Sequence, residues 1–256
     1  MKHLCFRFDI DTHKCIRDGV PNLLKLAKYH KLKFTFFINV GQAVDRLHFF
    51  QSKIKHSGQK IKTLSPLAKL GLKEYLYLCL LNPFIGKYTR EIRMIYQSGH
   101  EVGLHGGKNH QAWFNNAKSW SKDRIKNEIL WALNILNKID KKPIKGFASP
   151  GWNGSSRINS VLRELGFLYV SDKHFNKPYE KITQTEGLKE IPTNISGEPG
   201  GVGYLEHCRA LKMNDSQILE DFKDKLIARK KLTVVYDHPY FAGVKELALL
   251  GKMISV

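Results

Sequence analysis

Short apolar segments alternate with longer amphipathic segments along this chain. The short ones have the length and apolar content of strands, and they lie at residues 2–10, 33–40, 100–105, 144–150, 167–172, 188–193 and 232–238. Between them, apolar residues recur three and four positions apart, which predicts helices at 19–32, 89–99, 121–139, 155–166 and 214–230. This alternation predicts an α/β fold with a parallel sheet or barrel.

The 256 residues show no repeat or linker, so we expect one domain, 1–256. Residues 45–87 interrupt the alternation with an insertion. It joins an apolar run at 72–84 to a basic cluster of Arg46, Lys53, Lys55, Lys60, Lys62 and Lys69. The run is too short and too charged to span a bilayer. Two interpretations stay equal: a helical subdomain packed on the barrel edge, or a surface that lies on a membrane or grips a lipid tail.

The formal net charge of +19 and the pI of about 9.7 indicate an anionic partner. Nucleic acid, anionic lipid and phosphorylated substrates all qualify, but the chain has no recognisable nucleic-acid-binding motif, so no nucleic acid is expected. The four cysteines form no C-x-x-C pair, which fits a reducing compartment. The first residues lack the apolar region of a secretory signal, and a cytoplasmic location is predicted.

The stretch FDID, residues 8–11, places two carboxylates on one strand end. Side chains two apart share a strand face, so Arg7, Asp9 and Asp11 line up together. Two acids in such a position repel each other unless a cation or a proton separates them. The motif alone does not decide between a functional pair of acids and a purely structural role. The structural role would be a strand that ends in a polar loop, or an N-cap for the helix that follows.

Two histidines follow the strand at 100–105. His105 ends this strand, and a Gly-Gly loop returns His110 nearby. Together with Asp11 they resemble an N/N/O metal site with an open position, as a catalytic zinc or similar ion requires. Water on such an ion becomes a nucleophile near neutral pH, and Asp9 would be free to take its proton.

Two further stretches carry candidate residues. In FASPGWNG, the Pro150-Gly151 turn exposes a backbone N–H for a developing oxyanion, and Trp152 offers a flat apolar wall. On its own this stretch is better explained as an ordinary turn. In VVYDHPYFAG, His238 follows a strand at the end where barrel enzymes place catalytic groups, and it could donate a proton to a leaving amine.

In this order, FDID, GLHGGKNH, FASPGW, the YVSD run ending at Asp172, and DHPYFAG resemble the polysaccharide deacetylase (NodB-homology) superfamily. Within it, the chain is most similar to formamido-arabinose phospho-undecaprenol deformylases. The resemblance also includes the GVPNLL helix, the FFINVG strand, the insertion and EIPTN, so it covers nearly the whole chain.

The resemblance implies a deformed (β/α) barrel and a divalent metal, zinc first, with manganese or cobalt as alternatives. It implies that Asp9 is the catalytic base and His238 the general acid. It also implies that Asp11, His105 and His110 bind the metal. The residues expected to bind substrate or an oxyanion are Arg7, Pro150, Gly151, Trp152 and Asp172.

Two departures from the family pattern stand out. The usual H-x-x-x-H spacing would put the second metal histidine at position 109, where this chain has Asn109, and His110 follows one residue later. A one-residue insertion absorbed by Gly106 and Gly107 explains this, because Trp113 keeps its spacing from His110. Many deacetylases carry an arginine that pairs with the base, at the position of Ala148. Arg7, on the same strand face as Asp9, could replace it.

The predicted function is metal-dependent hydrolysis of an N-formyl or N-acetyl group from an amino sugar, on a lipid-phosphate (undecaprenyl-type) carrier. The alternatives are deacetylation of a polymeric glycan such as peptidoglycan, and a non-catalytic module that binds membrane or nucleic acid. An anionic membrane surface is an expected partner, at the inner face of the cytoplasmic membrane. The chain ends in a predicted helix at 243–256 instead of the expected last strand, so either the C-terminus is shortened or the barrel closure is unusual.

Overall fold

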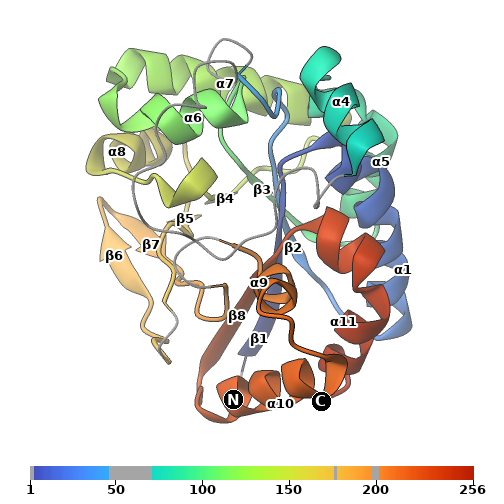
Figure 1. Ribbon diagram of the computed structural model, residues 1–256. Helices are drawn as coiled ribbons and strands as arrows, with labels where there is room; N and C mark the ends of the chain where they lie inside the picture. Colours follow the sequence, from blue (N-terminus) through green and yellow to red (C-terminus); the bar gives the residue numbers. More distant parts are fainter. Residues whose placement is uncertain (1–2, 46–70, 176–177, 198–201) are drawn as a thin grey trace.

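A curled eight-stranded sheet forms the centre of the molecule (Figure 1). The structure is a computed structural model and describes residues 3–45, 71–175, 178–197 and 202–256. The strands are β1 (His3–Ile10), β2 (Thr35–Ile38), β3 (Glu101–Leu104), β4 (Gly146–Phe147), β5 (Tyr169–Val170), β6 (Thr183–Thr185), β7 (Leu188–Glu190) and β8 (Leu232–Asp237). Their order is β6-β7-β5-β4-β3-β2-β1-β8, and every pair is parallel except β6–β7.

Helices lie around the outside of this sheet (Figure 1). They are α1 (Val20–Tyr29), α4 (Leu72–Leu80), α5 (Thr89–Gln97), α6 (His110–Asn116), α7 (Lys122–Ile139), α8 (Ser156–Glu164), α9 (Tyr204–Ala210), α10 (Asp215–Ile227) and α11 (Leu247–Ile254). Short helical turns join them at η1 (Cys15–Gly19), η3 (Ile85–Lys87), η4 (Ala117–Ser119), η5 (Pro150–Trp152) and η6 (Phe241–Lys245). The predicted α/β class and deformed barrel are confirmed.

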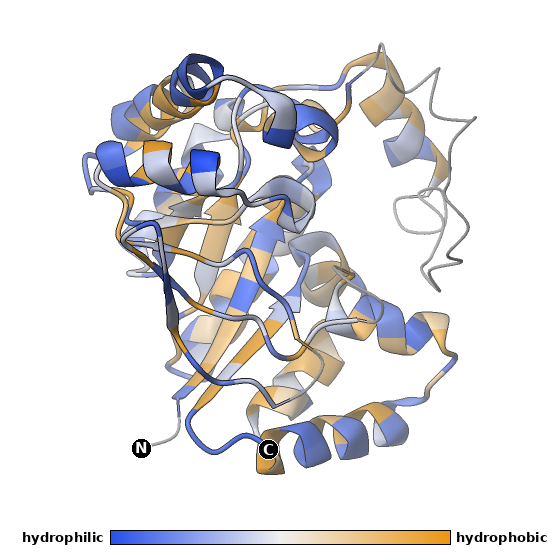
Figure 2. Ribbon diagram, turned by 90° about the vertical axis from the view of Figure 1, so that its left-hand side faces the viewer, coloured by the Kyte–Doolittle hydropathy of each residue, from blue (hydrophilic) through white to orange (hydrophobic). Residues whose placement is uncertain are grey.

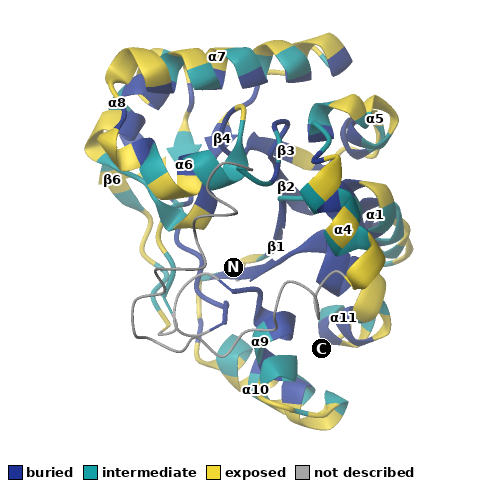
Figure 3. Ribbon diagram, turned by 45° about the horizontal axis from the view of Figure 1, so that its top comes forward, coloured by how far each residue is buried: buried dark blue, intermediate teal, exposed yellow. Residues whose placement is uncertain are grey.

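The two faces of β1 have different partners, as its alternation predicts. Phe6 and Phe8 face the helices: Phe6 lies 5.8 Å from the ring of Phe34 and 6.5 Å from Phe222 of α10. Arg7 and Asp9 are equally buried but hydrogen bond to each other inside the barrel. Hydrophobic residues dominate the central strands (Figure 2). Buried residues lie on the inner sides of the helices (Figure 3). Burying charged side chains such as Arg7 and Asp9 is costly unless they are paired and hydrogen-bonded, as these two are.

Several strands are shorter than the apolar pattern predicts. The expected strands at 144–150 and 167–172 are reduced to the two-residue strands β4 and β5. Pairing stops because the backbone N–H of Ser149 donates to the Asp172 carboxylate instead of a neighbouring strand. The strand β6 was not predicted. It forms an antiparallel hairpin with β7 through Glu186 and Gly187, both at positive φ, as a tight two-residue turn requires.

An extended segment after β7 closes the barrel, in place of a strand from the C-terminus. Ile195 bridges to Val235 of β8. The N–H of Asn194 donates to Val234 O at 3.1 Å, and the N–H of Tyr236 donates to Ile195 O at 2.9 Å. After β8, the chain continues into η6 and α11, and α11 packs on α1 and α10. The extended segment at residues 194–195 thus occupies the place beside β8 where a last strand was expected.

Part of the insertion is described as α4, whereas residues 46–70, with the basic cluster, lie outside the described residues. Glu74 holds this helix on the loop after β1, because it bonds to His13 at 2.7 Å and Arg17 at 2.9 Å. Along the opposite side, Leu72, Leu76 and Leu80 are exposed at four-residue intervals. Figure 3 shows much of α4 in yellow, the colour of exposed residues. Within the described part of the chain, no helix is both long and apolar enough to cross a bilayer.

Candidate metal centre and active site

Strand register brings the candidate residues to one end of the barrel. In the parallel pairs, Ile10 of β1 lies beside Ile38 of β2, and Ile38 beside Leu104 of β3. These strands therefore end at the same level, and the residues that follow them, Asp11 and His105, emerge together. Carboxyl ends of parallel strands are the usual place for a catalytic site.

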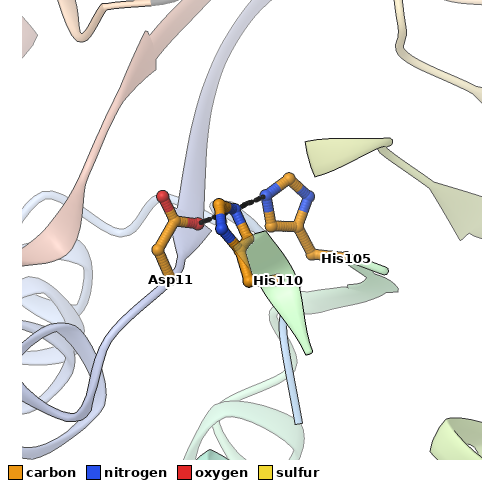
Figure 4. Close-up of side chains that lie close together, drawn as sticks. All are labelled: Asp11, His105 and His110. Carbon is orange, nitrogen blue, oxygen red and sulfur yellow. Dashed lines mark hydrogen bonds and ion pairs between the residues drawn. The ribbon is translucent and has the colours of Figure 1, made fainter. Parts of the chain in front are cut away.

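Asp11, His105 and His110 form one compact cluster (Figure 4). Oδ1 of Asp11 lies 3.2 Å from Nε2 of His105 and 3.4 Å from Nε2 of His110. The two imidazole Nε2 atoms are 3.3 Å apart. Donor atoms held at about 2.0–2.1 Å by a tetrahedral zinc ion are separated by roughly 3.3–3.4 Å. The spacing of the three atoms therefore fits a tetrahedral ion.

The hydrogen bonding of Asp11 supports the same interpretation. Its Oδ1 atom is buried and accepts no hydrogen bond among the described residues, although two histidines lie next to it. An unsatisfied buried carboxylate oxygen is costly unless a cation is present. The carboxylate and two imidazoles are also a donor set suited to zinc and related divalent ions.

Neighbouring residues orient both histidines. Nδ1 of His105 lies 2.7 Å from the carbonyl oxygen of Ala148, to which it donates, and this leaves Nε2 free as a ligand. The backbone N–H of His110 donates to Gln42 O at 2.8 Å. Gly41 permits this close approach of the two loops, because a Cβ there would overlap the carbonyl groups of residues 107 and 108.

Asn109 and His110 occupy different positions. The side chain of Asn109 caps α6 by accepting a hydrogen bond from Ala112 N at 2.9 Å, and it donates to Val44 O at 2.9 Å. It thus takes no part in the cluster, where the imidazole of His110 lies. This arrangement is the one expected for a one-residue insertion in the loop.

Arg7 binds Asp9 through two parallel hydrogen bonds. Its Nε donates to Oδ1 at 2.9 Å and its terminal nitrogen to Oδ2 at 2.7 Å. The other terminal nitrogen donates to Ser171 and to Thr193. The guanidinium is also 4.4 Å from the ring centre of Trp152. These contacts hold Arg7 rigidly, so the orientation of the Asp9 carboxylate is rigid as well.

His238 lies on the other side of Asp11. Its Nε2 is 3.1 Å from Asp11 Oδ2 and 2.9 Å from the hydroxyl of Tyr236. Burial lowers the pKa of His238, but the neighbouring Asp11 carboxylate outweighs it and raises the pKa to about 9. The two oxygens of Asp11 therefore have separate partners: Oδ1 faces His105 and His110, and Oδ2 faces His238.

Burial and neighbouring charges together set the charge state of the cluster. It lowers the pKa of His110 to about 4, so this imidazole is neutral at pH 7, as a metal ligand must be. Burial raises the pKa of Asp11, but the nearby rings of His110 and His238 outweigh this and hold the pKa well below its usual value. The cluster thus offers one carboxylate and a neutral imidazole.

The Pro150–Trp152 turn lies against the histidine loop. A Cβ at Gly106 would come within 2.9 Å of Pro150 Cγ, and Gly151 itself has φ of 64°. Asp172 accepts hydrogen bonds from the N–H and the hydroxyl of Ser149, at 2.6 and 2.9 Å. Asp172 therefore positions the turn with its two oxygens and does not point them freely into the site.

The sequence patterns missed several residues of this site. Tyr236 was missed although it lies two positions before His238, the spacing that places two side chains on one strand face. Ser171 and Thr193 were missed because nothing near them in the chain indicates that they bind Arg7. The contact of His13 with Glu74 joins positions 61 residues apart and had no local signal.

The chain is similar in sequence to two bacterial proteins, each named as a probable 4-deoxy-4-formamido-L-arabinose-phosphoundecaprenol deformylase, ArnD. The one from Wigglesworthia glossinidia brevipalpis is 32% identical over 162 residues, 60% of this chain and 54% of the relative. The one from Shewanella sediminis is 29% identical over 169 residues, 65% of this chain and 55% of the relative. The matches therefore span about half the length of these relatives.

Solved structures show the same fold at low identity. A probable polysaccharide deacetylase from Pseudomonas aeruginosa has a TM-score of 0.60 at 16% identity, covering 98% of this chain and 83% of the neighbour. A family 4 carbohydrate esterase from Streptomyces lividans has a TM-score of 0.54 at 10% identity, covering 99% and 86%. The family model described as polysaccharide deacetylase matches residues 2–170, well over half of the chain. The chain belongs to the polysaccharide deacetylase family.

Proposed function

We propose that this protein hydrolyses an N-formyl or N-acetyl amide on an amino sugar carried by a lipid phosphate. Asp11, His105 and His110 would hold a divalent ion, zinc by the spacing of their donor atoms. Family membership supports the reaction class, and the names of the two deformylase relatives support a lipid-linked substrate.

A divalent ion, when bound, would polarise the amide carbonyl and lower the pKa of a nearby water molecule towards neutrality. The ordered Arg7–Asp9 pair is the observation that carries the proposal. Oδ2 of Asp9 lies only 3.8 Å from Nε2 of His105, so this carboxylate adjoins the cluster without belonging to it. Asp9 is thereby placed to accept a proton from water.

Two further groups complete the chemistry. His238, held by Asp11 and Tyr236, is placed to donate a proton to the leaving nitrogen. The backbone N–H of Gly151, in the turn that packs on the histidine loop, would stabilise negative charge on the carbonyl oxygen. In this scheme, Arg7 and Asp172 position the reacting groups, and Trp152 forms an apolar wall.

The lipid part of the proposal is supported by α4 and by charge. The exposed leucines of α4 lie on a helix tethered to the loop after β1, next to the catalytic end of the barrel. The net charge of +19 favours an anionic surface. We infer that the protein works at the cytoplasmic membrane surface, on its inner face.

The test measures formate or acetate released by the zinc-loaded protein. Its substrates are a formylated and an acetylated amino-sugar phospholipid, and an acetylated glycan oligomer represents the polymeric alternative. The matched control is Asp9→Asn, which keeps side-chain shape and the bond from Arg7 Nε. It should retain zinc and lose about 10²–10⁴-fold in kcat.

Release from the lipid-linked sugars by the wild type, together with its loss in Asp9→Asn, is the expected result. Release of acetate from the glycan oligomer alone would show instead that the protein deacetylates a polymeric glycan. A protein that binds zinc at the cluster but releases acid from none of the substrates would contradict the proposed activity.

A further inference from the structure

Phe114 is an aromatic side chain that the reaction described above does not use. It lies on α6 four residues after His110, and residues four apart share a helix face. Helical side chains lean towards the N-terminus of their helix, which for Phe114 is the direction of His110 and the metal cluster. The ring is therefore about one helical turn, roughly 6 Å along the axis, from the residue that supplies a ligand.

Phe114 remains 48% exposed, whereas Trp113, its neighbour in the chain, is fully buried. Trp113 packs in the core against Trp120 and Phe147. Core packing therefore accounts for Trp113, whereas about half of Phe114 is open to solvent. Single exposed apolar side chains are common, so position has to decide whether this one has a function.

One side of the ring rests on the proposed oxyanion turn. A Cβ at residue 151 would overlap the ring carbons of Phe114, so glycine is required there for the ring to lie on the turn. Gly151 also has φ of 64°, which glycine adopts without strain. In addition, the side-chain amide of Asn153 donates to the carbonyl oxygen of Phe114. The turn thus contacts both the ring and the backbone of Phe114.

We propose that the exposed face of Phe114 forms an apolar wall of the sugar subsite and stacks on the C–H face of the ring that carries the acylated nitrogen. This inference rests on the proposed function and names the feature of the substrate that the site selects. A saccharide ring has a flat apolar face, and a rigid aromatic ring binds such a face with little loss of conformational entropy. The position one turn from His110 and on Gly151 puts this wall beside the scissile amide.

The test compares Phe114→Ala with Phe114→Trp, which keeps an aromatic face. Leu130→Ala is the matched control, because Leu130 is an exposed apolar residue of α7 with 43% exposure. Each protein, loaded with zinc, is assayed with a formylated amino-sugar glycoside and with N-methylformamide, which has no ring of any kind. Zinc content and thermal midpoint are measured for every variant.

For Phe114→Ala, KM for the glycoside should rise roughly tenfold. The value of kcat should change little, and kcat/KM for N-methylformamide should be unchanged. Phe114→Trp should restore KM, and Leu130→Ala should match the wild type. An equal fall on both substrates, or no change on the glycoside, would overturn the proposal.

Binding provides a second readout that does not need turnover. The deacylated amino-sugar glycoside is titrated into each protein by calorimetry. Weaker binding to Phe114→Ala, by a similar factor, supports the wall even if no substrate is hydrolysed, in which case the proposed activity alone fails. Equal binding of this glycoside by wild type and Phe114→Ala contradicts the wall even if hydrolysis is observed.

Discussion

Asn109 and His110 are neighbours in the chain, but their side chains do different things. The Asn109 side chain caps α6, and the His110 imidazole lies beside Asp11 and His105. This separation is the one expected if the loop after β3 is one residue longer than the H-x-x-x-H spacing. A histidine at the start of a capped helix is well ordered, which suits a metal ligand.

His110→Ala should reduce zinc binding strongly, because it removes one of three protein donors. Asn109→Ala should keep zinc at full stoichiometry and lose about 1 kcal/mol of folding stability, the usual cost of a lost N-cap. Metal analysis after dialysis and urea unfolding at pH 7 measure the two effects. The assignment fails if Asn109→Ala loses its zinc while His110→Ala retains it.

At the scale of single elements, His100 joins the starts of β2 and β3. The backbone N–H of Phe34 donates to Nδ1 of His100 at 2.9 Å, so the imidazole must be neutral to accept this bond. Burial, and then the charge of Lys33, lowers the pKa of His100 to about 4. Residues far from the catalytic end can therefore control the pH range in which the barrel is stable.

This pKa predicts acid sensitivity of the fold. The unfolded chain has the ordinary histidine pKa of about 6.5, so below that pH the unfolded state binds more protons than the folded state. Stability from His100 is therefore complete above pH 6.5 and declines as the pH falls towards 4. By pH 5, the loss is on the order of 2 kcal/mol.

His100→Asn keeps an acceptor for Phe34 N–H and removes the titration. Its unfolding free energy should fall less than that of the wild type between pH 7 and pH 5, measured by urea denaturation. His3→Asn is the control, because His3 is exposed on β1 and should leave the pH dependence unchanged. Equal losses in wild type and His100→Asn would show that His100 does not set the acid limit.

At the scale of the whole molecule, α4 lies close to the catalytic end of the barrel, with its exposed leucines on the side away from Glu74. Glu74 ties this helix to His13 and Arg17, in the segment that directly follows Asp11. If the substrate is lipid-linked, as proposed, hydrophobic side chains beside its site can enter the outer part of a bilayer. The same side of α4 would then orient the metal cluster towards the carrier lipid.

Replacing Leu72, Leu76 and Leu80 together by serine should weaken binding to vesicles of anionic phospholipid by tenfold or more, because about 1.5–3 kcal/mol is available per buried leucine. Cosedimentation measures the binding. Ile227→Ser is the control, since Ile227 is 75% exposed on α10, at the other end of the barrel (Figure 1).

Hydrolysis of a short soluble substrate should be unchanged in the leucine variant, because the cluster is intact. Reversal of Lys53, Lys55, Lys60 and Lys62 to glutamate should weaken vesicle binding most at low salt, since screening already reduces this attraction at high salt. Vesicle binding that is equal in the leucine variant, the lysine variant and the wild type would remove the membrane role of the insertion.

Local pattern was sufficient for the fold class, most of the helices and the types of residue at the site. The alternation in β1 predicted that Arg7 and Asp9 share a face, because side-chain direction in a strand depends on nothing beyond the strand itself. Strand–helix alternation likewise predicted parallel strands with their carboxyl ends together. The candidates Asp11, His105, His110 and His238 followed from this argument and from the family resemblance.

Contacts between distant segments decided the rest. No periodic pattern in the sequence indicates three of these contacts. They are the barrel closure by Asn194 and Ile195, the hydrogen bonds from Arg7 to Ser171 and Thr193, and the contact of the Phe114 ring with Gly151. Each forms only when separate elements pack, because hydrogen-bond partners and steric fit depend on where the whole chain places two segments. The sequence by itself therefore determined which chemical groups reach the carboxyl end of the barrel, and only the tertiary structure decided what holds and surrounds them there.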